Sequence, residues 1–429
     1  MNRHNLWRNT VLFLAATLVT AAIVEAVLRG LVRTSDDCYG NLAGVELPPC
    51  RLRSPYGAPL VTNRPEPYRD LVVDNRKITY GDLWGIARHD PVLGYTALEG
   101  ATSANGWWRT DRLGARVGRE SNESGPVTAR ILVFGDSYAV GSRLPFEETW
   151  SFALDDRHPA IAVSNFAMDG YSTAQAYLRY LSVRPAVEHD VVLLVLVPEE
   201  ALWRDVNVRR DVGAGWPIYW VLPRFDLVDD SLRLIQTPFP GQGSDLPHPP
   251  EDTDQKLKDH LRAFDRLYFD SMYEQPSGLG RAVVARLMTA AAHKHQVRQF
   301  RAGLMDADSE ALRISAAILR AMHTDVVTAG KRFAVAVLPT EWALEDTDRE
   351  FWETWDRMID VICGDGIPCI DLSQALRRIP DEEIDRGYDG SHFGPVLSRE
   401  IGRALGDGLS ALDLIPSRTT SGSPGGNQP

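Results

Sequence analysis

The sequence contains little cysteine and no excess of positive charge. Its 429 residues include four cysteines, and 46 Lys and Arg against 58 Asp and Glu give a formal net charge of -12. Proteins that bind nucleic acid gather Lys and Arg on one surface, so this balance argues against nucleic acid as a partner. The CxxC spacing is absent and no histidine lies close to a cysteine pair, so no metal site is predicted.

The four cysteines form two local pairs. Cys38 and Cys50 flank a loop rich in Gly and Pro, and Cys363 and Cys369 flank Gly364 to Pro368. This arrangement predicts two disulfides in an oxidising compartment. Four unpaired thiols in a reducing cytosol are the alternative, and the N-terminus bears on the choice.

A hydrophobic run lies near the N-terminus. Val11 to Val24 contains only apolar and small residues, and the run continues past Glu25 and Arg29. A membrane span needs about 20 residues. We therefore predict that 11–32 is a transmembrane signal-anchor, with 1–10 in the cytoplasm and the bulk of the chain on the periplasmic or extracytoplasmic side. Glu25 is expected near the outer interface, paired with Arg29 one helical turn later.

Two other interpretations of this run are open. Ala21 and Ala22 are small residues at its end, so it is also compatible with a signal peptide whose cleavage releases a secreted protein. The third interpretation is a buried helix of a cytosolic protein. Export agrees better with the two cysteine pairs.

From residue 129 the sequence alternates between strand and helix patterns. Continuous apolar runs, typical of strands buried on both faces, occur at Ile131–Phe134, Ile161–Phe166, Val191–Val197, Phe333–Leu338 and Cys369–Leu372. Helical patterns lie between or after them, at Thr173–Leu181, Ser309–Thr328, Glu341–Ile362 and Val396–Leu409. The alternation predicts an α/β domain over 129–412, with a parallel sheet and helices on both faces.

Three other regions have a different character. Residues 33–128 are irregular and are interpreted as an N-terminal wrap or linker. An insertion over about 207–305 contains a predicted β-hairpin at Phe225–Ile235 and then helices, and is interpreted as a cap over the site. The tail 413–429 is rich in Ser, Thr, Gly and Pro and is predicted to be disordered from Ser417.

The strongest local motif is Gly135-Asp136-Ser137-Tyr138, directly after the first buried strand. Ligands bind beyond the carboxyl ends of strands in a parallel sheet, so Ser137 is placed where a nucleophile would act. A structural turn is the alternative explanation of the motif. A serine nucleophile also needs a base, usually histidine, oriented by a carboxylate.

The candidate bases share an Asp-x-x-His spacing that occurs three times, at Asp155 and His158, Asp245 and His248, and Asp389 and His392. His158 is expected at the exposed end of a helix, and His248 lies in a Pro-rich loop. Only His392 follows the last strand and precedes the last helix, which returns it to the sheet edge of Ser137. We predict His392 as the base and Asp389 as its partner, with a helix-capping role for His392 as the alternative.

Three sequence blocks resemble those of the SGNH (GDSL-like) hydrolases. Ile131–Gly141 is similar to the first block, Asn165–Thr173 to the second and Asp389–His392 to the last. The resemblance as a whole extends over roughly 129–410. A bacterial subgroup with an N-terminal membrane anchor is especially similar. The resemblance implies a flavodoxin-like three-layer α/β/α sandwich and no metal or organic cofactor.

The resemblance also implies roles for single residues. Ser137, His392 and Asp389 would form a catalytic triad, and the amides of Ser137 and Gly170 would form the oxyanion hole. The third block of the family places Asn after the third strand, where this chain has Glu199. An ionised Glu donates no hydrogen bond, and losing one oxyanion donor costs about 10²–10³ in rate.

Several consequences of Glu199 are open. It could be protonated by burial and act as the donor, Arg204 or Asn207 could replace it, or catalysis could be weak or absent. It could also point to solvent as a residue that begins a helix.

The predicted function is an exported serine esterase that removes O-acyl groups, often acetyl, from an envelope or secreted glycan or another ester. One alternative is an O-acyltransferase in polysaccharide modification. Another is a catalytically impaired glycan-binding protein with the same fold. The three triad residues favour catalysis, whereas Glu199 favours the last alternative. The oligomeric state does not follow from the sequence.

Overall fold

The computed structural model describes residues 3–52, 55, 71–73, 76–78, 87–103, 106–117, 127–209, 221–239, 251–345, 348–388 and 390–416. The described residues fall into two compact units. Unit 1 combines those of 1–54 with those of 250–302, and unit 2 contains most of the rest. The start of the predicted wrap and the helical half of the predicted insertion therefore belong together in unit 1.

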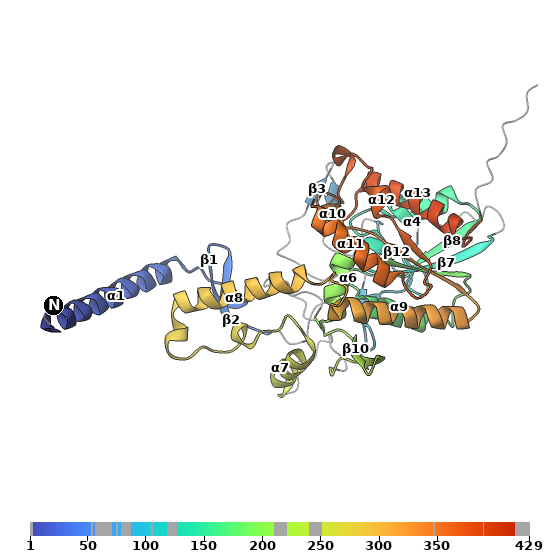
Figure 1. Ribbon diagram of the computed structural model, residues 1–429. Coiled ribbons are helices and arrows are strands. Elements are labelled where there is room, and N and C mark those ends of the chain that lie inside the picture. Colours follow the sequence, from blue (N-terminus) through green and yellow to red (C-terminus); the bar gives the residue numbers. More distant parts are fainter. Residues whose placement is uncertain are drawn as a thin grey trace, which may run out of the picture. The chain divides into compact units, whose positions relative to one another are not determined.

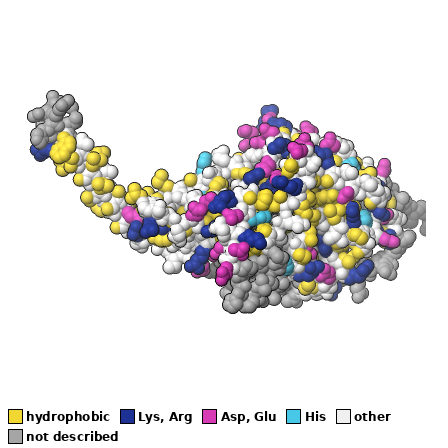
Figure 2. Space-filling model, turned by 90° about the horizontal axis from the view of Figure 1, so that it is seen from below, with side chains coloured by type: hydrophobic (Ala, Val, Ile, Leu, Met, Phe, Trp, Pro, Cys, Tyr) yellow, Lys and Arg dark blue, Asp and Glu magenta, His cyan; other side chains and the backbone are white. Residues whose placement is uncertain are grey.

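Unit 1 begins with helix α1 (Arg3–Leu31). Within it, Trp7–Leu31 includes an 18-residue stretch that has a mean hydropathy of 2.4 and no buried residue, and hydrophobic side chains cover this helix (Figure 2). By length and composition this segment is sufficient to cross a membrane, and a signal sequence would meet the same criteria. The predicted pair is present, with Arg29 Nε 2.7 Å from Glu25 Oε1.

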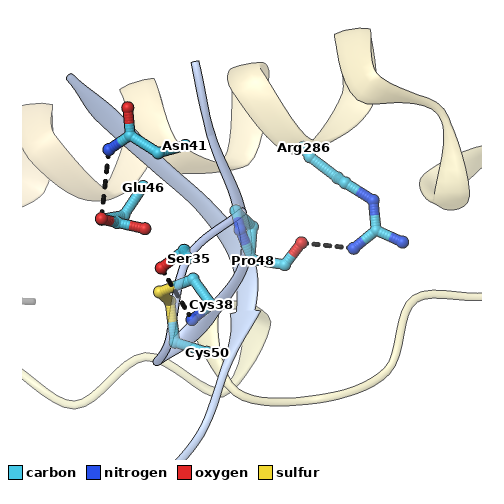
Figure 3. The surroundings of a disulfide bond; sticks show 7 residues. All are labelled: Ser35, Cys38, Asn41, Glu46, Pro48, Cys50 and Arg286. Carbon is cyan, nitrogen blue, oxygen red and sulfur yellow. Dashed lines mark hydrogen bonds between the residues drawn. A yellow bond between two sulfur atoms is a disulfide. The ribbon is translucent and has the colours of Figure 1, made fainter. Parts of the chain in front are cut away.

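A disulfide-linked hairpin and a long helix form the rest of the unit 1 core. Strands β1 (Cys38–Leu42) and β2 (Val45–Cys50) pair antiparallel, and the predicted bond between Cys38 and Cys50 is present (Figure 3). Arg286 donates to the carbonyl of Pro48 and lies over the Tyr39 ring at 3.7 Å. The other helices of the unit are α7 (Thr253–Phe264), α8 (Val283–Ala302) and the 3-10 helices η3 (Asp270–Met272) and η4 (Gly278–Arg281).

Helix α8 is also fixed to α1. The Glu25 carboxylate accepts hydrogen bonds from the backbone amides of Val283 at 2.8 Å and Val284 at 3.3 Å. The amides in the first turn of a helix have no acceptor within their own helix, so a carboxylate there accepts hydrogen bonds that would otherwise not form. Glu25 therefore joins the apolar helix to the remainder of unit 1.

Unit 2 is built on a parallel five-stranded sheet, in the order β13-β12-β9-β7-β8. The strands are β7 (Ala129–Phe134), β8 (Ile161–Asn165), β9 (Val191–Leu196), β12 (Arg332–Val337) and β13 (Cys369–Asp371). All five predicted strands are confirmed. Strand β9 is buried at every residue, and β7 and β12 are buried at every residue except Arg130 and Arg332, which explains their continuous apolar sequences.

Helices cover both faces of this sheet (Figure 1). One layer contains α4 (Trp150–Arg157), α12 (Ser373–Leu376) and α13 (Pro395–Ala411). The other contains α5 (Thr173–Val183), α6 (Pro198–Asp205), α9 (Glu310–Thr328) and α11 (Arg349–Ile362). The predicted three-layer α/β/α architecture is confirmed.

Some details differ from the sequence-based expectation. The helix predicted at Glu341–Ile362 is two helices, α10 (Glu341–Leu344) and α11, because Asp348 caps a new helix start. The predicted hairpin is present as β10 (Arg224–Val228) and β11 (Ser231–Ile235). Small hairpins also form from β3 (Leu71–Val73) and β4 (Arg76–Ile78), and from β5 (Ala87–Asp90) and β6 (Gly94–Ala97).

The second predicted disulfide, between Cys363 and Cys369, joins the end of α11 to the start of β13. The tail predicted to be disordered from Ser417 lies outside the described residues.

Candidate active site

The turn after β7 places Ser137 at the carboxyl edge of the sheet. Gly135 has φ +147°, and a Cβ there would lie 2.5 Å from both the Val195 carbonyl oxygen and the Ala139 Cβ. Only glycine fits such a position without displacing its neighbours. Asp136 then accepts a hydrogen bond from the Tyr138 amide at 3.0 Å and caps the short helix α3 (Ser137–Val140). Ser137 is therefore held in the first turn after the central strand.

The structure brings His392 to Ser137. Its Nε2 lies 2.8 Å from Ser137 Oγ, although the two residues are 255 positions apart. Its Nδ1 lies 2.8 Å from Ser391 Oγ. Asp389, the predicted triad acid, lies outside the described residues. The geometry thus assembles the nucleophile with its predicted base.

The electrostatic surroundings of His392 favour a neutral ring. Burial lowers its pKa well below the usual value, and the positive charges of Arg143 and Arg204 lower it further. A neutral imidazole has a lone pair that can accept the serine proton, whereas an imidazolium does not. The histidine is therefore in the state that a general base requires.

The loop that carries Gly170 is fixed to the same edge. The Met168 amide donates to the Gly135 carbonyl at 3.1 Å. The Tyr95 hydroxyl donates to the Asp169 carbonyl at 2.5 Å, and the Asp169 carboxylate accepts from the Ser142 hydroxyl. Gly170 itself has φ +71°, in the left-handed region that favours glycine. These bonds hold the predicted second oxyanion residue in the loop next to the nucleophile turn.

Glu199 does not extend into solvent. Its Oε1 accepts hydrogen bonds from the backbone amide of Thr340 at 3.1 Å and from its hydroxyl at 3.3 Å. Its Oε2 is buried without a hydrogen-bond partner in the described part of the chain. Burial raises the pKa of the carboxyl to about 7. Glu199 therefore links the start of α6 to the segment after β12.

The two other candidate donors are engaged elsewhere. Arg204 donates to the carbonyl of Glu200 at 2.6 Å and to its carboxylate at 2.7 Å, and lies 3.9 Å from Asp136. Asn207 donates to the carbonyl of Trp203. These contacts place both side chains in the packing around α6.

Replacing Glu199 with glutamine is expected to stabilise the protein more at pH 8 than at pH 5. The raised pKa means that the folded chain keeps a proton which the unfolded chain loses between about pH 4.5 and 7. Wild-type stability therefore falls as the pH rises through this window, by up to about 3 kcal/mol, and glutamine removes this loss. Urea midpoints of both proteins at the two pH values test this.

The exposed Glu350 in the first turn of α11 provides the matched control. Glu350→Gln changes no buried charge, so its effect on the urea midpoint should be nearly the same at both pH values. An equal shift for Glu199→Gln at pH 5 and pH 8 would contradict the ionisation argument.

Of the two rival histidines, the structure describes His158, which is not at this edge. His158 was expected at an exposed helix end, and that prediction is wrong: it is 4% exposed at the end of α4. Its Nε2 packs on the backbone of Gly406 in α13, where a Cβ would approach it to 2.5 Å. His248 and Asp245 lie outside the described residues. Within the described ranges, no group of three His, Cys, Asp or Glu residues could hold a metal ion.

Two residues of the site were not identified from the sequence. Tyr95 supports the Gly170 loop from a region interpreted as an irregular wrap, and the only local signal was a turn at Asp90-Pro91 just before it. Glu341 is fully buried and contacts both His392 and Tyr138, but in the sequence it is only one acidic residue at the start of a helix. Contacts between residues this far apart in the chain produce no periodic pattern in the amino-acid sequence.

Comparisons with known proteins found matches among solved structures alone, and these are distant. No protein-family model matches the sequence, and no curated protein matches it. A G-D-S-L family lipolytic protein from Desulfitobacterium hafniense DCB-2 is 11% identical, with a TM-score of 0.32 over 66% of this chain and 100% of that one. A lipase/acylhydrolase from Enterococcus faecalis is 12% identical, with a TM-score of 0.32 over 66% and 97%.

A catalytic mutant of an acetylxylan esterase from Geobacillus stearothermophilus is 13% identical, with a TM-score of 0.31 over 68% of this chain and 99% of that one. Likenesses at this level are too distant to assign an activity, which has to rest on the geometry of the site. In its sequence blocks and in its three-layer fold, the chain resembles the SGNH (GDSL-like) hydrolases.

Proposed function

We propose that this protein is an exported serine esterase of the SGNH type. The observation that carries the proposal is the 2.8 Å hydrogen bond between His392 Nε2 and Ser137 Oγ. A serine and a neutral, half-buried histidine in this arrangement, at the carboxyl edge of a parallel sheet, have the geometry of an activated nucleophile.

In the proposed reaction, His392 takes the proton of Ser137 as the oxygen attacks the ester carbonyl carbon. The resulting tetrahedral oxyanion accepts hydrogen bonds from the backbone amides of Ser137 and Gly170. The imidazolium then gives its proton to the leaving alcohol, and an acyl-enzyme forms. Water, deprotonated by His392, attacks this acyl group and releases the acid and free Ser137. Asp389 is proposed to hold the imidazole in the required tautomer.

Glu199 supplies no oxyanion donor in this scheme. Its Oε1 accepts two hydrogen bonds from Thr340, which supports a role in joining the start of α6 to the segment after β12. The protein would then work with two backbone donors, and its turnover would be lower by about the 10²–10³ that one side-chain donor contributes.

The proposed location and substrate class follow from unit 1 and the disulfides. Two disulfides and an exposed apolar helix support export, with α1 as a single-pass anchor and the bulk of the chain outside the cytoplasm. An esterase held at that surface would meet O-acyl groups, such as acetyl groups, on envelope or secreted glycan.

Labelling with a fluorophosphonate tests the nucleophile. Wild type should incorporate the probe at Ser137, and Ser137→Ala should incorporate none, because the probe forms its bond only with an activated serine. Ser151→Ala, which removes another buried serine in α4, is the matched control and should label like wild type. Equal labelling of wild type and Ser137→Ala would show the assignment to be wrong.

The same proteins test the substrate class. Wild type should release acetate from an acetylated glycan, and Ser137→Ala should release none. Transfer of the acetyl group to an acceptor sugar in place of its release would identify an acyltransferase.

A further inference from the structure

A buried carboxylate lies behind the catalytic pair. Glu341 begins α10, just after β12, and its exposed fraction is 0%. Each of its oxygens accepts one hydrogen bond: Oε1 from the His392 backbone amide at 2.9 Å, and Oε2 from the Tyr138 hydroxyl at 3.0 Å. Glu341 thus contacts His392, the proposed base, and Tyr138, which follows the proposed nucleophile in the chain.

The backbone of His392 needs such a contact. Its φ is +61°, in the left-handed region, which is unfavourable for a residue with a Cβ. A conformation of this kind persists where surrounding contacts hold it, and such residues cluster at functional sites. The hydrogen bond from the His392 amide to Glu341 is a contact that fixes this conformation.

The imidazole ring is supported through the second oxygen. The Tyr138 ring lies against the His392 ring, with 4.5 Å between the centroids. The Tyr138 hydroxyl, bound to Glu341, prevents this ring from turning away. One carboxylate therefore fixes the backbone of the base and the aromatic surface on which its ring rests.

We propose that Glu341 is a positioning residue that holds His392 in line with Ser137. This inference rests on the proposed esterase function and assigns part of its machinery. The His392 amide can only donate, so the role requires an acceptor at Oε1, whereas the Tyr138 hydroxyl can donate or accept. Glutamine could therefore keep both hydrogen bonds, with its oxygen toward His392 and its NH₂ group toward Tyr138. Leucine has no polar side-chain atom, so it should lose both contacts and release part of the site.

The charges near this group are consistent with the role. Arg143 and Arg204 are the charged groups that act on His392, and Arg386 is the cation that acts on Glu341. Burial raises the pKa of Glu341, whereas its hydrogen bonds from Tyr138 and His392 lower it. The net direction is a raised pKa, so burial outweighs the hydrogen bonds, which by themselves favour the carboxylate form.

Two variants test the proposal. Glu341→Leu should lower kcat by about 10²-fold, the cost of displacing a catalytic group by about 1 Å, with little change in KM. Tyr138→Phe keeps the ring and removes one hydrogen bond, so kcat should fall between about 2- and 10-fold. Rates are expressed per active site, counted by fluorophosphonate incorporation, so that loss of folded protein does not enter kcat.

Tyr177→Phe is the matched control. Tyr177 on α5 donates to Asp325 at 2.6 Å, a tyrosine–carboxylate bond away from the catalytic pair, and its loss should leave kcat and KM unchanged. Wild-type kcat in both Glu341→Leu and Tyr138→Phe would overturn the proposal. If Glu341→Leu does not fold, wild-type kcat in Tyr138→Phe overturns it. An unlabelled wild type would instead refute the serine esterase itself.

Discussion

Replacing His392 with alanine is expected to reduce ester turnover by about 10⁶-fold, the loss that follows removal of the base from a serine–histidine pair. The reason is the bond at 2.8 Å between its Nε2 and Ser137 Oγ, since the hydroxyl is a poor nucleophile without an acceptor for its proton. Steady-state hydrolysis of p-nitrophenyl acetate, with purified full-length protein in detergent, measures the effect.

His158→Ala is the matched control because it removes another buried histidine with the same Asp-x-x-His spacing. Its packing against Gly406 predicts a loss of stability but a normal rate per labelled site. If His392→Ala kept wild-type ester turnover and His158→Ala lost it, the base would be His158 and not His392.

Replacing Gly135 with alanine is expected to cause the largest loss of stability among single methyl additions near the site. The new Cβ would lie 2.5 Å from the Val195 carbonyl oxygen, which belongs to the neighbouring strand and cannot move freely. Overpacking in a core costs about 1–3 kcal/mol, and the φ of +147° adds backbone strain of similar size. Urea unfolding followed by tryptophan fluorescence measures the change.

Gly330→Ala separates the two contributions. Gly330, in the turn between α9 and β12, also has a positive φ, of +72°, but a Cβ there would meet nothing within 4 Å. The free energy of unfolding of Gly330→Ala should therefore fall only by the conformational cost of about 1–2 kcal/mol. Equal losses at both positions would show that steric contact with Val195 is not what restricts residue 135.

The sequence was sufficient to predict the sheet and the proximity of Ser137 and His392. Strands buried on both faces have continuous apolar sequences, so β7 and β9 could be recognised without knowledge of their neighbours. The carboxyl ends of parallel strands meet at one edge, so Ser137 and His392 could be expected there together. The disulfides were predictable because each pair of cysteines is close in sequence.

Other features could not be predicted because they depend on contacts between distant segments. Glu341 and Tyr138 are 203 positions apart, and no local propensity records their hydrogen bond. The helical half of the insertion belongs to unit 1 together with the start of the chain, and no local pattern indicates this grouping. Nothing in the pattern of α8 reveals that its first amides bind Glu25. The conformation around Glu199 depends in the same way on Thr340.

The contact between Glu25 and Val283 has a consequence for biosynthesis. The two residues are 258 positions apart, and β7, β8 and β9 lie between them in the chain. Ribosomes deliver domains from the N-terminus, and most fold in that order. Here α1 emerges first but has to wait for α8, and unit 2 in turn has to wait for β12, β13 and His392. The nascent chain therefore carries three strands of an open sheet while its first unit is still incomplete, which makes the interval before residue 283 the period of greatest risk for aggregation.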